Sequence, residues 1–376
     1  MGKKIEKCMK NAVARAIARL VRVRKISPAE LASVHIERLL VLRQHNQMGD
    51  MLTAVPAFRG IRRRFEGARI TLLAAPVNSE VMRNNPYVDE VLVYAKREYR
   101  GRPLRLVHLI RRLRRRRFDL AIVLNTFSFS VTSMLLAAAS GARIRIGSTS
   151  KPFGSDLTSR FYHMELPLPS AGERVGMHES RHNLYPLAAI GVSEDNLGSL
   201  IVPTAADEQD CVSFLATVAP AGAHFIVIHP GAGKKENIWP AESFAAVARA
   251  LSLRFGLQVV MVRGPMDGEA CDRFLETYPG TVAVISRPSV GFLGALMTRA
   301  ALTLCNDTGI MHIAGAVGAR CVAVFGPTDP ARWKPVGDHV VAVSSADGKV
   351  SSVHVRDVID RAGAILDPLV RNEFDM

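Results

Sequence analysis

Short apolar runs alternate with longer segments in which apolar residues recur at helical spacing, and this alternation continues along nearly the whole chain. In the first half the short runs predict buried strands at Arg38–Arg43, Arg69–Ala75, Glu90–Tyr94, Asp119–Asn125 and Arg143–Gly147. The segments between them predict helices at Asp50–Phe65, Ser79–Asn84, Leu104–Arg117 and Phe129–Ser140. Strands that alternate with helices are typical of an α/β protein with a parallel sheet.

The pattern weakens in the middle of the chain and starts again in the second half. Residues 148–176 are rich in Ser, Pro and Gly and predict loops, whereas Arg181–Ile190 predicts a helix that ends at a Gly191 C-cap. Further strands are predicted at His224–His229, Gln258–Val262, Val282–Ile285, Leu302–Asn306 and Arg320–Phe325. The matching helices are predicted at Ala241–Phe255, Gly268–Tyr278, Val290–Ala300, Thr308–Val317 and Val353–Leu366.

Two doubly wound, Rossmann-like domains that face a cleft are therefore predicted. The length of 376 residues also exceeds what one hydrophobic core usually supports. Residues 193–221 lack a clear period, and we place the linker between the domains there. The predicted parts are a basic amphipathic extension at 1–35, a first domain at 36–192, the linker at 193–221, a second domain at 222–345, and a C-terminal helix and tail at 346–376.

Composition narrows the class of protein further. Apolar residues make up 48% of the chain and charged residues 22%, as in an ordinary soluble globular protein. No apolar run could span a bilayer, and the N-terminus lacks the pattern of a secretory signal. The five cysteines contain no CxxC pair, which argues against a disulfide framework and a cysteine-built zinc site. We therefore expect a cytoplasmic protein.

The net charge of +15 is concentrated in two segments. Residues 1–25 hold nine Lys or Arg against one Glu, and residues 96–117 hold eleven against one Glu, so the remainder is close to neutral. Such patches attract anionic partners without identifying them. In the first segment, apolar residues recur at helical spacing, namely Ile5, Met9, Val13, Ile17 and Leu20. A helix on the surface of an anionic membrane, a mitochondrial transit peptide, and a solvated or core-packed helix all fit this pattern.

The first candidate for chemistry is the sequence Gln47-Met48-Gly49-Asp50, which follows the strand predicted at Arg38–Arg43. Gly49 permits a tight turn, and Asp50 then stands at the N-terminus of a helix, where backbone N–H groups and the helix dipole favour a negative charge. A carboxylate in this place could take a proton from a hydroxyl group. An ordinary N-cap is the alternative interpretation of Asp50.

Two later junctions predict sites for phosphate. His229-Pro230-Gly231-Ala232-Gly233-Lys234-Lys235 closes a strand with a flexible backbone and two lysines, although an ordinary glycine turn fits as well, and the pattern is not a P-loop. Asn306-Asp307-Thr308-Gly309-Ile310-Met311-His312 joins a strand directly to a helix. The N–H groups of that first helical turn suit a pyrophosphate, with His312 on the same helix, and capping by Asp307 or Thr308 is the simpler alternative.

His178-Glu179-Ser180-Arg181-His182 matches the HExxH pattern of zinc proteases. Neither the Gly nor the third His of the longer zinc-protease signature follows, and Arg181 adds a positive charge inside the motif. We therefore expect a plain helix here and no metal site. No Asp-x-Asp motif occurs in the chain either.

The order of these motifs resembles glycosyltransferase family 9, whose best-known members are heptosyltransferases. The first half has the Gly-Asp turn, Ala54-Val55-Pro56-Ala57, and Asn85-Pro86 before Val88-Asp89-Glu90-Val91. The second half has HPGAG, Trp239-Pro240, Arg263-Gly264-Pro265, Asn306-Asp307-Thr308-Gly309, and Val324-Phe325-Gly326-Pro327-Thr328-Asp329-Pro330. The resemblance spans about residues 36 to 345 and implies a GT-B architecture.

This resemblance implies transfer of a sugar from a nucleotide sugar, typically ADP-heptose, with inversion and without a metal or other cofactor. By position, Asp50 would be the general base. The donor would be bound by Gly231, Gly233, Lys234, Lys235, Asp307, Thr308, Gly309 and His312. The chain departs from the family at Asn237, because similar heptosyltransferases usually carry a lysine two residues before the Trp-Pro pair.

The acceptor implied by the resemblance is an anionic glycolipid of the lipopolysaccharide-core type at the inner face of the cytoplasmic membrane. Arg111, Arg112 and Arg115 of the second basic segment could contact its phosphates and carboxylates, or could form a plain solvated face. A catalytically silent protein that binds nucleotide sugars is the main alternative. A nucleic-acid-binding protein fits less well, because neither basic segment interleaves aromatic residues or shows a known DNA-binding spacing.

Overall fold

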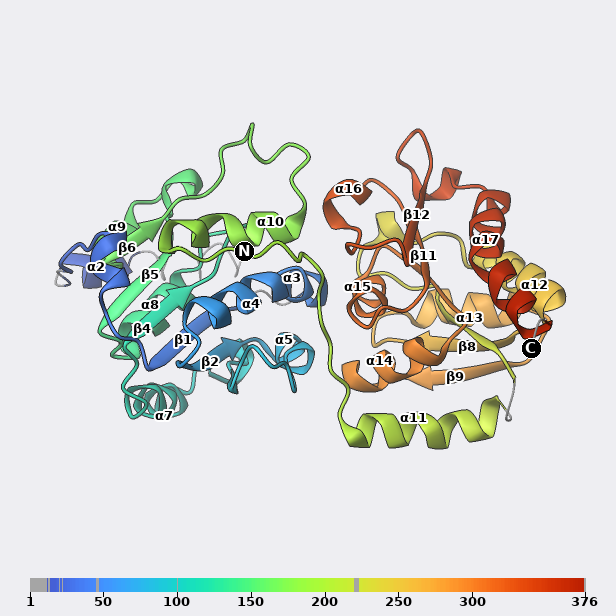
Figure 1. Ribbon diagram of the computed structural model, residues 1–376, viewed down its shortest axis with the longest axis horizontal. Coiled ribbons are helices and arrows are strands. Elements are labelled where there is room, and N and C mark those ends of the chain that lie inside the picture. Colours follow the sequence, from blue (N-terminus) through green and yellow to red (C-terminus); the bar gives the residue numbers. More distant parts are fainter. Residues whose placement is uncertain are drawn as a thin grey trace. The chain divides into compact units, whose positions relative to one another are not determined.

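The computed structural model describes residues 12, 14–19, 21, 23–44, 47–99, 101–219 and 223–374, which form two compact units that divide after Leu197. Each unit contains one six-stranded sheet. Figure 1 shows helices packed against both sheets. The predicted α/β class, with two doubly wound Rossmann-like domains, is therefore confirmed.

All strands of the first sheet are parallel. They are β1 (Arg38–Arg43), β2 (Arg69–Ala74), β3 (Glu90–Val93), β4 (Leu120–Val123), β5 (Ile144–Ser148) and β6 (Met164–Leu166). Their order is β3-β2-β1-β4-β5-β6, so the direction of progress along the sheet reverses between β1 and β4. In such a sheet the loops that follow the two strands at the reversal flank the usual ligand site.

Both faces of the first sheet are covered. Leu40 and Leu42 of β1 belong to a core that also contains Leu109 and Leu113 of α7 and Met134 of α8. The alternate residues of β1 point to the other face, where α4 packs against α10. The helices of this unit are α2 (Pro28–Ala32), α3 (Met48–Leu52), α4 (Val55–Arg64), α5 (Pro76–Val81), α6 (Lys96–Tyr99), α7 (Pro103–Arg114), α8 (Val131–Ala139), α9 (Leu157–Phe161) and α10 (Glu179–Leu184).

The single helix predicted at Asp50–Phe65 is in fact two helices, α3 and α4. Pro56 explains the break, because it has no N–H to donate to the carbonyl of Leu52 and its ring would collide with that carbonyl in a continuous helix. The helix α3 accordingly ends at Leu52, and Pro56 occupies the first turn of α4, where its missing N–H is tolerated. The break leaves Asp50 in a short helix of its own.

The second sheet repeats the topology of the first. Its strands are β7 (Phe225–His229), β8 (Gln258–Arg263), β9 (Val282–Ser286), β10 (Leu302–Asn306), β11 (Cys321–Phe325) and β12 (Val340–Ser344), all parallel. Their order is β12-β11-β10-β7-β8-β9, which places the reversal between β7 and β10. The predicted phosphate loops follow these two strands.

The core of the second unit surrounds Trp239, which is fully buried. Its indole N–H donates to the carbonyl oxygen of Val353 at 3.1 Å, and its ring meets the edge of Phe244. The helix α17 packs on α12, and α14 packs on both α11 and α15. The helices of this unit are α11 (Ala205–Val218), α12 (Ala241–Phe255), α13 (Gly268–Thr277), α14 (Val290–Arg299), α15 (Gly309–Ala316), α16 (Pro330–Trp333) and α17 (Val355–Phe374).

Two strands, the long helix α11 and the short helices α2, α6, α9 and α16 were not predicted. The strands β6 and β12 each form one edge of a sheet, and β6 lies in the stretch predicted to be loops. The helix α11 lies in the stretch predicted to be the linker, although the two units do divide within that stretch, after Leu197. A capping box begins α11, in which Thr204 accepts from the Asp207 N–H and Asp207 accepts from the Thr204 N–H.

The described part of the N-terminal extension packs on the first unit. Residues 14–19 are helical, and Ala14 is fully buried in the core while Ile17 is 37% exposed. The ammonium group of Lys25 donates to the carbonyl oxygen of Tyr162 at 2.7 Å. Ile5, Met9, Val13 and Leu20, on which the predicted membrane helix depends, lie outside the described residues. Among the described helices, none has the length and apolar character needed to cross a membrane.

Replacement of Asp207 by Ala should destabilise the second unit. The carboxylate accepts from Thr204 in the capping box and from the Ser289 hydroxyl at 2.6 Å, and the side chain is 8% exposed. Loss of these bonds should lower the free energy of unfolding by roughly 1–3 kcal/mol. Thermal unfolding and faster hydrogen exchange in residues 205–218 would measure it. Asp210→Ala, an exposed position on the same helix, is the control, and equal effects of the two changes would contradict this account.

Candidate active site

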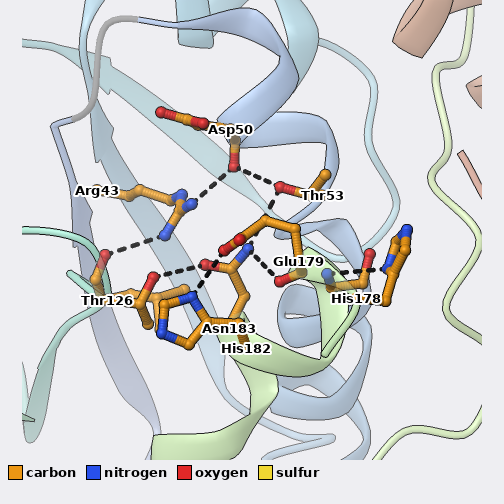
Figure 2. A network of polar contacts seen from close by, with 10 residues as sticks. Arg43, Asp50, Thr53, Thr126, His178, Glu179, His182 and Asn183 are labelled. Atoms are coloured by element: carbon orange, nitrogen blue, oxygen red, sulfur yellow. Dashed lines mark hydrogen bonds and ion pairs between the residues drawn. The ribbon is translucent and has the colours of Figure 1, made fainter. Parts of the chain in front are cut away.

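The carboxyl end of β1 lies at the reversal of the first sheet, and Asp50 follows it closely. Asp50 is the third residue of α3, is 9% exposed, and stands in the first turn, as predicted. The N-cap position belongs to Gln47, so Asp50 is not an ordinary N-cap. In Figure 2 its carboxylate points away from the polar network that its backbone carbonyl joins.

Arg43, the last residue of β1, fixes this region although its side chain is completely buried. Its guanidinium donates to the carbonyl oxygen of Leu124 at 3.2 Å and to the carbonyl oxygen of Asp50 at 2.7 Å. Burial lowers the pKa of Arg43 to about 10, and the charges of Asp50 and Glu179 oppose that shift. The group therefore stays protonated at neutral pH, and the buried positive charge links the ends of β1 and β4 to α3.

The helix α10 supplies the rest of the network (Figure 2). Glu179 is fully buried, and its carboxylate lies 2.9 Å from Nδ1 of His182. The Asn183 amide donates to the Thr53 hydroxyl at 3.3 Å and accepts from the Thr126 hydroxyl at 3.0 Å. The network thus joins α10 to α3 and to the loop after β4.

The HExxH motif therefore has a structural explanation. His178 is the N-cap of α10, and its Nδ1 accepts from the Ser180 N–H at 3.1 Å. His182 pairs with Glu179 instead of converging with His178 on a metal. In the part of the chain that the structure describes, no group of three or more His, Cys, Asp or Glu could hold a metal ion.

The three arginines predicted to bind an acceptor lie elsewhere. Arg111, Arg112 and Arg115 stand at the end of α7, and Arg112 lies 3.8 Å from Glu90, the first residue of β3. In the same turn, the Arg116 carbonyl accepts from Arg38, the first residue of β1. Arg43 and Asp50 lie at the other end of β1, roughly 17 Å away for a strand of this length. The structure does not bring these arginines to Asp50.

In the second unit, Asn306 joins the two loops at the reversal. It is the last residue of β10 and is fully buried. Its amide donates to the carbonyl oxygens of Pro230 at 2.9 Å and Gly231 at 3.1 Å, and its Oδ1 accepts from the Trp239 N–H at 3.0 Å. The predicted loop at 229–235 is thereby fastened directly to the start of the 306–312 motif.

Asp307 extends this junction to a third loop. Its Oδ2 accepts from the Asn237 amide at 3.2 Å and from the Thr328 hydroxyl at 2.5 Å. Burial raises the pKa of Asp307, while the bond from Thr328 and the charge of Lys234 oppose the rise. The Oδ1 of Asn237 is buried without a hydrogen-bond partner among the described residues. The carboxylate therefore organises the loops after β7, β10 and β11.

The helix α15 begins as predicted, directly after this junction. Thr308 is its N-cap and accepts from the Ile310 N–H at 3.3 Å, so of the two residues considered as alternative caps it is Thr308 that caps the helix. Gly309 is the first helical residue, and His312 lies one turn further on, 4% exposed. The amino end of α15 lies just beyond the carboxyl end of β10, and a helix N-terminus favours an anion.

The glycines of the 229–235 loop have different surroundings. A Cβ atom on Gly231 would lie 2.3 Å from the Asp267 carboxylate, so only glycine fits there. Asp267 is held in place by the Gly264 N–H at 2.8 Å. Gly233 is exposed and has open space around it. The side chains of Lys234 and Lys235, which follow it, are also exposed. The loop therefore combines one fixed end with an exposed basic end.

The sequence analysis did not single out Arg43, Glu179, Asn306 or Thr328 for these roles. All four depend on partners far away in the chain, so their local sequence carries little signal. Arg43 did carry a local signal, because an arginine at the end of an otherwise apolar strand must find buried partners. For Thr328, the turn Gly326-Pro327-Thr328-Asp329-Pro330 was recognised only as part of the family pattern.

Two Rossmann-like units, each with a polar junction where its strand order reverses, are the components of a GT-B glycosyltransferase. Residues 106–362 match the family model described as glycosyltransferase family 9 (heptosyltransferase). The chain belongs to glycosyltransferase family 9 and is a glycosyltransferase.

Individual relatives agree with this family. Lipopolysaccharide heptosyltransferase 3 of Escherichia coli is 26% identical over 332 residues, which cover 83% of this chain and 90% of that protein. A glycosyl transferase family 9 structure from Veillonella parvula DSM 2008 has a TM-score of 0.76 at 22% identity and covers 89% of this chain and 99% of its own. The structure of E. coli heptosyltransferase WaaC with ADP has a TM-score of 0.70 at 18% identity, and the match covers 87% of this chain and 99% of that structure's chain.

Removal of the negative charge of Glu179 should destabilise the first unit. Glu179→Gln keeps the shape of the side chain but leaves the buried Arg43 with one carboxylate fewer, which should cost about 3 kcal/mol of unfolding free energy. Thermal unfolding would measure the loss, with the exposed Glu66→Gln as the control.

A double-mutant cycle separates this pairing from a simple packing defect. If the two charges stabilise each other, Arg43→Met combined with Glu179→Gln should cost less than the sum of the single changes. Strictly additive losses would contradict the pairing.

Proposed function

We propose that this glycosyltransferase moves a heptose from ADP-heptose to a lipid-linked acceptor of the lipopolysaccharide-core type, with inversion at the anomeric carbon and without a metal ion. The family and the heptosyltransferase relatives support the sugar and the acceptor class. E. coli heptosyltransferase WaaC, which has been solved with ADP and with ADP-2-deoxy-2-fluoro heptose, supports the nucleotide. The observation that carries the proposal is the position of Asp50 at the reversal of the first sheet, fixed by Arg43.

Asp50 acts as the general base in this proposal. Arg43 and Thr53 bond to its backbone carbonyl, at 2.7 and 3.2 Å, so they fix the residue without using its carboxylate as their acceptor. The carboxylate takes the proton of the acceptor hydroxyl, and the acceptor oxygen forms a bond to the anomeric carbon. At the same time the bond from that carbon to the diphosphate breaks, and its electron pair leaves with ADP. A single displacement of this kind inverts the configuration.

The second unit binds the donor in this proposal. The amino end of α15, with Thr308, Gly309 and His312, contacts the diphosphate, and Lys234 and Lys235 add positive charge beside it. Gly233, which is exposed and has open space around it, lets the backbone of the loop approach the phosphates, and Gly231 fixes the start of the loop against Asp267. Asp307 acts by orienting three loops through Asn237 and Thr328, because direct contact with a phosphate would be repulsive.

Asn237 stands where lysine is usual in the family. Its position supports a donor-binding site that functions without that lysine. Its amide bonds to Asp307, and its buried Oδ1 has no hydrogen-bond partner among the described residues. Lys234, whose charge already acts on Asp307, supplies the positive charge in place of the usual lysine. A nucleotide-sugar donor and a lipid-linked acceptor together fit an enzyme that acts at the cytoplasmic face of the inner membrane.

Asp50→Asn should abolish transfer while donor binding survives. The amide keeps the shape of the side chain but cannot accept the proton, so we expect turnover to fall about 10²- to 10⁴-fold. Release of ADP in the presence of acceptor measures turnover, and calorimetry with ADP-heptose measures binding. Asp195→Asn, an exposed carboxylate of the same unit, is the matched control. Loss of donor binding in Asp50→Asn would instead indicate a structural role.

The donor can be identified by thermal-shift titration of the whole chain with ADP-, UDP-, GDP- and dTDP-sugars without added metal. A ligand that binds only the folded state raises the unfolding temperature, and ADP-heptose should give the largest rise. Thr308→Ala should reduce that rise. A rise without turnover on any acceptor would support a silent nucleotide-sugar-binding protein, and no rise with any donor would contradict the donor site.

A further inference from the structure

The exposed face of α7 is a basic surface that the proposed reaction does not use. Leu109 and Leu113 turn toward the core, and the opposite side of the helix presents Leu104, Val107, His108, Arg111 and Arg115. Leu104, His108, Arg111 and Arg115 are spaced three or four apart and Val107 stands beside His108, so the five residues lie on one stripe of the helix. We call this stripe the outer face of α7; in Figure 1 the helix lies at the border of the first unit.

Two features of the outer face are unusual for a solvated helix. Leu104 is 82% exposed and Val107 is 42% exposed, so two large apolar side chains stand in water on the same stripe. The side chains of Arg111 and Arg115 are exposed, and no described residue pairs with them.

Neighbouring arginines on the inner side of the helix have a structural role. Arg116 bonds to Glu90, and Arg114 donates to the carbonyl oxygen of Ala139 at 2.9 Å. The basic segment therefore divides into arginines that hold α7 on the sheet and arginines that face outward. Because the outward arginines lie at the end of β1 remote from Asp50, binding of the acceptor at the catalytic carboxylate does not account for them.

We propose that the outer face of α7 docks the enzyme on the surface of an anionic lipid bilayer. Arginines at this surface attract acidic headgroups, and the apolar side chains between them enter the boundary between headgroups and acyl chains. Nucleic acid fits the face less well, because its phosphates would match the arginines but would leave Leu104 and Val107 in water. The face holds the first unit at the membrane independently of the chemistry at Asp50.

Vesicle flotation of the whole chain tests this proposal without donor or acceptor. The protein should bind vesicles of phosphatidylcholine mixed with phosphatidylglycerol and not vesicles of phosphatidylcholine alone. Arg111→Glu with Arg115→Glu should weaken binding to the anionic vesicles at least about tenfold, since each basic residue near the surface contributes to attraction. Leu104→Ser should weaken it by a smaller factor that persists at high salt, where charge attraction is screened.

Matched controls are available in the second unit. Arg249→Glu with Arg320→Glu makes the same change in net charge at exposed positions, and Leu253→Ser changes a leucine that is 78% exposed. Both controls should bind anionic vesicles as the unchanged protein does. Unchanged thermal unfolding would show that the α7 variants remain folded, and Arg111→Gln with Arg115→Gln repeats the test if the charge reversal does not fold.

Three outcomes would overturn the proposal. Absence of binding to anionic vesicles would exclude a membrane role for the face. Binding that survives the change of Arg111 and Arg115 would assign it to another surface, including the basic extension at 1–35. Tighter binding to single-stranded RNA than to vesicles, lost in the same variant, would make the face a nucleic-acid site. None of these outcomes depends on whether Asp50 is the general base.

Discussion

A buried polar side chain fastens neighbouring strand ends together at the reversal of each sheet. In the first unit it is Arg43, at the end of β1, which donates to the carbonyl oxygen after β4 and to that of Asp50. In the second it is Asn306, at the end of β10, which donates to the carbonyl oxygens of Pro230 and Gly231 after β7. Both side chains are fully buried, so water cannot replace a lost bond.

These buried connections between strand ends determine where the candidate site residues of each sheet lie. Parallel strands bring all their carboxyl ends to one edge, but the loops there would diverge at the reversal without a connection. The two side chains provide that connection, and Asp50 in the first unit and the amino end of α15 in the second follow it closely. Asp307 then adds the loop after β11 through Thr328. The proposed site thus depends on secondary-structure ends and not on long mobile loops, which favours precise geometry.

The sequence predicted what depends on local pattern and missed what depends on distant partners. Strands buried on both faces are continuous apolar runs, so the central strands and the class of fold were predicted correctly. The edge strands β6 and β12 are short or only partly buried and were missed. The helix α11 has little amphipathic contrast, and only the capping box of Thr204 and Asp207 marked its start. The plain helix expected at the HExxH pattern is present, but nothing local indicated that the charge of Glu179 acts on Arg43, far away in the chain.

The buried charge of Arg43 also affects when the first unit can finish folding during synthesis. Residue 43 leaves the ribosome early, but Glu179 and the Asn183 that bonds to Thr53 across 130 positions leave it only near the end of the first unit. Until then the guanidinium has no buried counter-charge on α10 and remains better solvated by water. The polar network around Arg43 is therefore completed late in the synthesis of the first unit, shortly before the second unit begins to emerge.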